Sequence, residues 1–172
     1  MSQVVMLRTS FAAVSSLNDC LAKVARVRPR QAQALAKLDL KEVVNECVGK
    51  AIAAMLANHK DITRCDGPAD YYNKEQTAVD GLNVIAAFKS TAFTRGIGVM
   101  MDNDGTIRYS GDVYGGQNQA ARNLINIFEE YLKIEIAQAA AKILDYKAIA
   151  SQTQILPDGD PVFTVEMIKV KE

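Results

Sequence analysis

The stretch from Gly96 to Lys169 constrains the fold most, because it has the pattern of two β-hairpins separated by one long amphipathic helix. The first hairpin turns at Asn103-Asp104-Gly105 and the second at Pro157-Asp158-Gly159, where a final glycine accommodates a positive φ. Between the turns, apolar residues recur at helical spacing from Leu124 to Ile143, which predicts a helix over Gln117–Leu144. This order of segments predicts an antiparallel α+β core.

The N-terminal part supplies further strands and one helix. Val4–Leu7 is a short β-branched run, and an apolar helical stripe follows at Leu17, Cys20, Leu21 and Val24. Other strands are expected at Leu82–Phe88, Ile97–Met101 and Thr106–Tyr114. We predict a single α+β domain over residues 1–172, with an antiparallel sheet of about five to six strands. The sheet is expected to pack against the N-terminal helix and the long C-terminal helix.

Two segments have the pattern of additions to this core. Residues 30–60 are rich in Ala, Leu, Lys and Glu and predict a helical insertion, with Asp39 as a candidate N-cap. Residues 61–81 carry Gly67-Pro68, Tyr71-Tyr72 and Asp80-Gly81, which is typical of a surface connection. Such a connection is long for a compact domain, so we expect part of it to be functional.

The overall charge balance argues against a protein that coats a polyanion or a membrane surface. The 172 residues include 20 basic and 20 acidic side chains, so no global field attracts nucleic acid or anionic lipid. No apolar run approaches the ~18–20 residues that span a bilayer. Cys20, Cys47 and Cys65 form no close pair, which argues against disulfides and against zinc. We expect no membrane contact and a location in the cytoplasm or an equivalent plastid stroma.

One local basic cluster surrounds Pro29 and consists of Lys23, Arg26, Arg28 and Arg30. Single-stranded nucleic acid is usually bound by basic residues interleaved with aromatic ones. The sequence has no aromatic residue between Phe11 and Tyr71. A solvated linker or contact with an acidic protein is therefore the preferred interpretation, and a nucleic-acid accessory is the less favoured one.

Known catalytic and phosphate-binding motifs are missing from the sequence. Asp102-Asn103-Asp104-Gly105 resembles the start of a calcium loop, but its glycine comes too early, so turn formation is the preferred explanation. Gly115-Gly116 precedes a helix N-terminus, whose free N–H groups attract anions, so an anion site is an alternative to a plain turn. His59 is the single histidine, and the sequence has no Gly-x-Ser-x-Gly motif that could supply a nucleophilic serine for a catalytic triad with it. We expect neither a cofactor nor a metal.

The best polar constellation combines Arg108, Asp112 and Tyr114, which alternate along one predicted strand and so share one face of the sheet. An arginine there can hold a carboxylate or phosphate, and an aspartate can act as a base. The alternative is a solvated face with an Arg–Asp pair that contributes less than ~1 kcal/mol.

A family resemblance is carried by six segments: Met6–Thr9, Leu17–Leu21, Gly96–Val99, Asp104–Asp112, Tyr131-Leu132 and Asp158-Gly159. Their order resembles the hypothetical chloroplast reading frame 35 family, an uncharacterised group from algal plastids, cyanobacteria and other bacteria. The resemblance covers about two thirds of the chain and implies the α+β fold, but no established activity. Gene clusters of the family imply an association with AAA+ ATPases. The extra helical segment and the lack of an aromatic residue near the C-terminus are departures, and cellular or viral origin stays open.

The leading hypothesis is a non-enzymatic interaction or adaptor protein that binds a protein partner or a second copy of itself. Two docking elements are expected: an apolar helix stripe containing Val44, Val48 and Met55, and the connection that carries Tyr71 and Tyr72. The alternative hypothesis is a domain that binds a small anionic ligand, or an enzyme, acting through Arg108, Asp112 and Tyr114.

Overall fold

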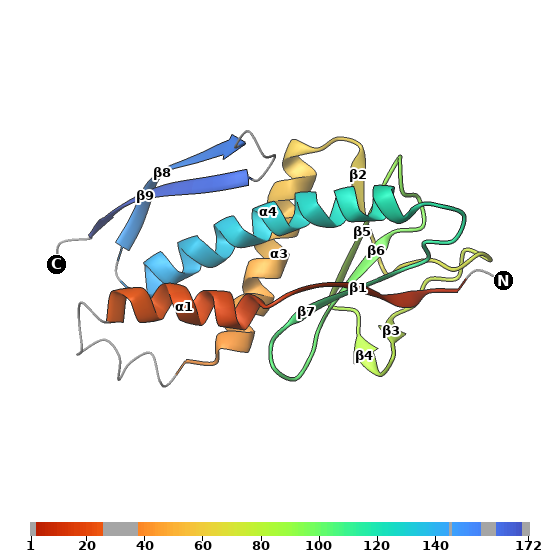
Figure 1. The fold of residues 1–172 in the computed structure, drawn as a ribbon, viewed down its shortest axis with the longest axis horizontal. Coiled ribbons are helices and arrows are strands. Elements are labelled where there is room, and N and C mark those ends of the chain that lie inside the picture. The colour runs from red at the N-terminus through yellow and green to blue at the C-terminus, as the bar shows by residue number, and fades with distance from the viewer. Residues whose placement is uncertain (1–2, 26–37, 145, 156–160, 170–172) are drawn as a thin grey trace.

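A computed structural model describes residues 3–25, 38–144, 146–155 and 161–169 (Figure 1). Its helices are α1 (Ala13–Ala25), α3 (Leu40–Asn58) and α4 (Asn118–Ile143). Its strands are β1 (Val5–Phe11), β2 (Ile62–Cys65), β3 (Ala78–Val79), β4 (Leu82–Asn83), β5 (Ala86–Ser90), β6 (Ile97–Met101), β7 (Ile107–Gly111), β8 (Tyr146–Ile155) and β9 (Pro161–Lys169). The predicted α+β class is confirmed.

The main sheet has five antiparallel strands in the order β1-β7-β6-β5-β2, so β1 and β2 are its two edges. The predicted hairpin at Asn103-Asp104-Gly105 joins β6 to β7 and pairs Gly98 with Ser110. Gly105 has a φ of +80° there, as the turn requires. Strand β1 pairs regularly with β7 only at its ends, because the register shifts between Met6 and Ser10.

One face of the sheet packs against the helices and forms the main core. Helix α4 crosses this face with its N-terminal half, and its C-terminal half lies near α1 (Figure 1). Phe128 of α4 is fully buried, with its ring 5.1 Å from that of Phe88 and edge-on to Tyr109. Aromatic pairs of this kind add to the stabilisation that comes from burying apolar area.

Helix α3 belongs to this core. Its buried face consists of Val44, Cys47, Val48, Ala51, Ile52 and Met55. The helix begins where predicted, because the Asp39 side chain accepts hydrogen bonds from the N–H groups of Lys41 and Glu42. The expectation of an exposed docking stripe at Val44, Val48 and Met55 is therefore wrong. The same apolar pattern packs inward against α4 and the sheet.

The opposite face of the sheet is covered by the segment between β2 and β5. Pro68 lies against Gly98, where a Cβ atom would come within 2.9 Å of the proline ring. Further along, the β3–β4 hairpin brings Val79 onto Met100 and Val4, and these three side chains form a second buried cluster. Residues 61–81 are therefore more than the surface connection that the sequence predicts, since they include β2 and β3 and cover β6 at Gly98 and Met100.

Other boundaries differ from those predicted. The strand expected at Leu82–Phe88 is two strands, β4 and β5, because the chain changes partner from β3 to β6 between them. The strand that starts near Thr106 ends at Gly111 instead of Tyr114. The second predicted hairpin is present as β8–β9, which forms a separate sheet among the described strands and packs on α4. Its turn at Pro157–Gly159 lies outside the described residues.

No helix in the described part of the chain combines the length and apolar character needed to cross a bilayer.

Candidate functional site

Arg108, Asp112 and Tyr114 do not form a common site. Arg108 lies within β7, whereas Asp112 and Tyr114 lie beyond its end. The Nε atom of Arg108 donates to Oδ2 of Asp102 over 2.9 Å. Asp112 is 1% exposed, and Tyr114 is 68% exposed. The predicted constellation is therefore wrong as a convergent site, because each of its three members has a different environment.

The pairing of Arg108 with Asp102 stabilises the β6–β7 turn. The other carboxylate oxygen of Asp102 accepts hydrogen bonds from the N–H groups of Asp104 and Thr106. Oδ1 of Asp104 also accepts from the N–H of Thr106, over 2.8 Å. The carboxylates of Asp102 and Asp104 therefore accept hydrogen bonds from the backbone of the turn. This agrees with the preferred interpretation of Asp102–Gly105 as a turn.

Asp112 forms an ion pair with Arg95, which lies in the turn between β5 and β6. The carboxylate is nearly inaccessible to water, while the Arg95 side chain is 24% exposed. Asp112 also accepts a hydrogen bond from the N–H of Tyr114 over 3.2 Å. The pair thus ties the β5–β6 turn to the segment that leads from β7 into α4.

Arg95 connects this ion pair to Tyr71 and Tyr72. Its guanidinium lies 5.6 Å from the ring centroid of Tyr71, a cation–π distance. Its carbonyl oxygen accepts a hydrogen bond from the N–H of Ala69 over 2.7 Å. The Tyr71 ring meets the Tyr72 ring edge to face at 5.4 Å. We call Tyr71 and Tyr72 the tyrosine surface, since both side chains are exposed and Tyr71 also contacts the Arg95 guanidinium.

The turn that carries Tyr71 and Tyr72 is held by Asp70. Its Oδ1 atom accepts hydrogen bonds from the N–H groups of Tyr72 and Lys74, over 2.8 and 3.0 Å. The backbone closes the turn twice, from Asn73 N–H to the Asp70 carbonyl and from Asp70 N–H to the Lys74 carbonyl. Asn73 has a φ of +58°, which asparagine tolerates better than most residues. The two rings therefore project from a fixed backbone.

A hollow of about 330 Å³ adjoins Tyr72. Its lining consists of Gln3, Val4, Asp70, Tyr72, Gln76, Ala78, Val79 and Asp80. Two carboxylates and no basic residue line it, so the hollow favours a cationic group.

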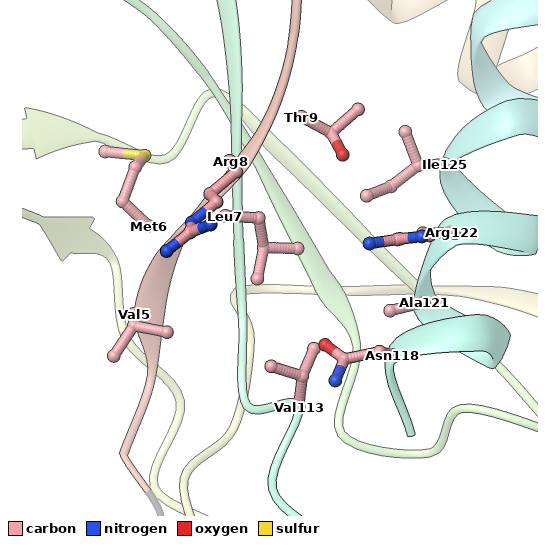
Figure 2. A pocket seen from close by; sticks show the side chains of 10 residues that line it. All are labelled: Val5, Met6, Leu7, Arg8, Thr9, Val113, Asn118, Ala121, Arg122 and Ile125. Atoms are coloured by element: carbon pink, nitrogen blue, oxygen red, sulfur yellow. The ribbon is translucent and has the colours of Figure 1, made fainter. Parts of the chain in front are cut away.

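A second hollow lies between β1 and the start of α4 (Figure 2). It is close in sequence to Gly115 and Gly116, whose φ angles of +80° and +84° form the turn that leads into the helix. Both glycines are exposed. The proposed anion site on the two glycines themselves stays a prediction.

No three His, Cys, Asp or Glu side chains in the described part of the chain come together as a metal site would require. His59 ends α3 and packs edge-on against the ring of Tyr131 at 5.8 Å. Comparison of the chain with protein-family models, curated proteins and solved structures finds no match.

Proposed function

We propose that this chain is a non-enzymatic interaction protein that binds a protein partner through the tyrosine surface. The observation that supports this most is the pair Tyr71 and Tyr72, which are 62% and 73% exposed although they stand on a turn fixed by Asp70. Tyrosines supply a large contact area with few rotatable bonds. Their presentation on a fixed turn lowers the entropy lost on binding.

The chemistry of the surface favours a partner that presents an arginine or lysine. Tyr71 already holds the guanidinium of Arg95, which illustrates the affinity of these rings for a cation. The adjoining hollow offers Asp70 and Asp80 and no basic residue. A basic side chain of the partner would enter this hollow and lie against Tyr72.

Homo-oligomerisation is a second form of the same proposal, because Lys23, Arg26, Arg28 and Arg30 give each copy a basic segment. Light scattering on the purified protein tests it directly. If the protein is a homo-oligomer, the double variant Tyr71→Ser/Tyr72→Ser should be a monomer. The control variant Leu38→Ser removes an apolar side chain that is 40% exposed and lies outside the tyrosine surface, so it should leave the oligomer intact.

A heteromeric partner is tested by affinity capture with the wild type, the Tyr71→Ser/Tyr72→Ser variant and the Leu38→Ser control. We expect the wild type and the Leu38→Ser control to capture a protein that the double variant does not capture. Direct binding of that protein is then measured with both components purified. The family resemblance makes an AAA+ ATPase the first purified candidate. A strictly monomeric wild type that retains no protein through these tyrosines would contradict the proposal.

A further inference from the structure

The second hollow, between the edge strand β1 and the first turns of α4, has a volume of about 220 Å³. Its lining consists of Val5, Met6, Leu7, Arg8, Thr9, Val113, Asn118, Ala121, Arg122 and Ile125. Figure 2 shows Arg122 extending from α4 toward β1, with Thr9 and Asn118 on either side of it. The hollow belongs neither to the tyrosine surface nor to the Arg95–Asp112 pair.

The strand side of the hollow is irregular. The register between β1 and β7 shifts between Met6 and Ser10, so residues 7–9 leave the regular ladder. Strand β1 also has no neighbour on its outer side among the described strands. A bulge of this kind prevents regular addition of another strand and often lies beside a binding site. The hollow therefore suits a compact ligand better than an extended peptide.

The charge of the hollow is positive. Arg122 extends into it from α4, Arg8 lines it from β1 with its side chain along the strand on the side of Met6, and no carboxylate lines it (Figure 2). Neither arginine has an ion pair within the part of the chain that the structure describes, whereas Arg95 and Arg108 each pair with an aspartate. The start of α4 adds to this field, because α4 has no acidic residue in its first turn and Gln117 makes no side-chain capping bond.

The other lining groups complete a site for a small anion. Thr9 and Asn118 offer polar side chains next to Arg122, which lies one helical turn after Asn118 on the same face of α4. Leu7, Val113 and Ile125 supply an apolar wall. The volume corresponds to about seven water molecules at ~30 Å³ each and is smaller than most drug-sized pockets.

We propose that this hollow binds a small molecule that carries a phosphate or carboxylate group. Arg122 binds the anionic group, with Thr9 and Asn118 as additional hydrogen-bond donors, and Arg8 adds positive charge from the β1 side. The apolar wall contacts the remainder of the ligand. This moves the expected anionic ligand from Arg108 and Asp112 to Arg122 at the start of α4.

The test uses three probes: inorganic phosphate, pyrophosphate and succinate, each compared with sodium chloride at equal ionic strength. Titrations are followed by amide chemical shifts and by the unfolding temperature, which rises when a ligand binds the folded state. The variants are Arg8→Gln, Arg122→Gln and, as a control on the opposite edge strand, Arg64→Gln. Arg8, Arg64 and Arg122 are all exposed, so all three variants are expected to fold.

We expect at least one probe to shift the amides of residues 7–9 and 118–122 and to raise the unfolding temperature. Arg122→Gln should weaken that binding by about tenfold or more, because a charge-assisted hydrogen bond is lost. Arg64→Gln should leave it unchanged. Binding of the phosphates without succinate assigns a phosphorylated ligand, and the reverse assigns a carboxylate. The proposal fails if no probe binds at tens of millimolar, or if binding survives Arg122→Gln unchanged.

Discussion

The hydroxyl of Tyr109 donates a hydrogen bond to Oε1 of Glu129 over 3.0 Å, and this bond joins strand β7 to helix α4. Tyr109 is fully buried, so its hydroxyl has no access to water. Tyr109→Phe removes the donor and should lower the free energy of unfolding by about 1 kcal/mol. Urea unfolding measures this loss. Tyr131→Phe is the matched control and should change stability little, since the hydrogen bonds found among the described residues do not involve the Tyr131 hydroxyl.

The same pair predicts a pH dependence. Burial raises the pKa of Glu129 above its ordinary value, although the bond from Tyr109 and the charge of Lys133 oppose the shift. The folded protein therefore holds this proton more tightly than the unfolded chain, and stability falls as the pH rises from the unfolded to the folded pKa. Glu129→Gln should stabilise the protein at pH values above this window and have a smaller effect below it. Urea unfolding of both proteins is measured above and below this pH window. An equal change in stability on the two sides would contradict a raised pKa of Glu129.

The buried ion pair predicts unequal effects of its two deletions. Arg95→Ala leaves the nearly inaccessible carboxylate of Asp112 without its partner and should cost about 3–5 kcal/mol. Asp112→Ala leaves Arg95, which is partly exposed and can be hydrated, so the loss should be smaller. Arg108→Ala removes the more exposed pair with Asp102 and should cost less than about 1 kcal/mol. The order of the three variants is measured by urea unfolding, and a reversed order for Arg95 and Asp112 would contradict it.

The partner of Asp112 was predictable in principle from the hairpin. The turn at Asn103-Asp104-Gly105 sets a register that pairs Gly98 with Ser110. Two residues further along, the same register brings Gly96, and with it Arg95, opposite Asp112. The sequence pattern predicts a strand that extends to Tyr114 and places Asp112 beside Arg108, either in an open polar constellation or in a solvated Arg–Asp pair. Neither interpretation predicts a buried carboxylate paired with Arg95.

The helices and the first hairpin were predictable because local signals determine them. Asp39 caps α3, and the apolar spacing from Leu124 to Ile143 lies within α4. The burial of α3 and the covering of the sheet by residues 61–81 depend on long-range packing, for example Pro68 on Gly98. An apolar helix face has the same pattern whether it packs inward or binds a partner. The hollow at Arg8 and Arg122 has no sequence signal, since it joins a strand and a helix far apart in the chain.

Gly105 and Gly81 have nearly the same left-handed backbone conformation, but only Gly105 is crowded by a neighbouring side chain. Alanine substitutions at the two positions therefore separate the cost of backbone strain from the cost of a steric clash. Gly105 and Gly81 have φ angles of +80° and +81°. A Cβ atom at position 105 would lie 2.1 Å from a methyl carbon of Val14, whereas a Cβ at position 81 meets no atom within 4 Å. Gly81→Ala should cost about 1 kcal/mol from the backbone alone. Gly105→Ala should cost clearly more, because α1 must move away from the turn. Equal losses in thermal unfolding would show that Val14 accommodates the methyl group.

The burial of Cys47 predicts slow thiol chemistry. Its side chain is 2% exposed and lies against α4, with Sγ 3.6 Å from the carbonyl oxygen of Glu135. Burial, reinforced by the charge of Glu135, raises the pKa of the Cys47 thiol to about 11. Because the thiolate is the reacting form, its fraction near pH 8 should be about a hundredfold lower than in the unfolded chain. Iodoacetamide labelling followed by peptide mass spectrometry should therefore modify Cys20, which is partly exposed, before Cys47. Labelling in guanidinium supplies the unfolded reference rate, and a Cys47 that reacts equally fast in both states would place it outside the α3–α4 interface.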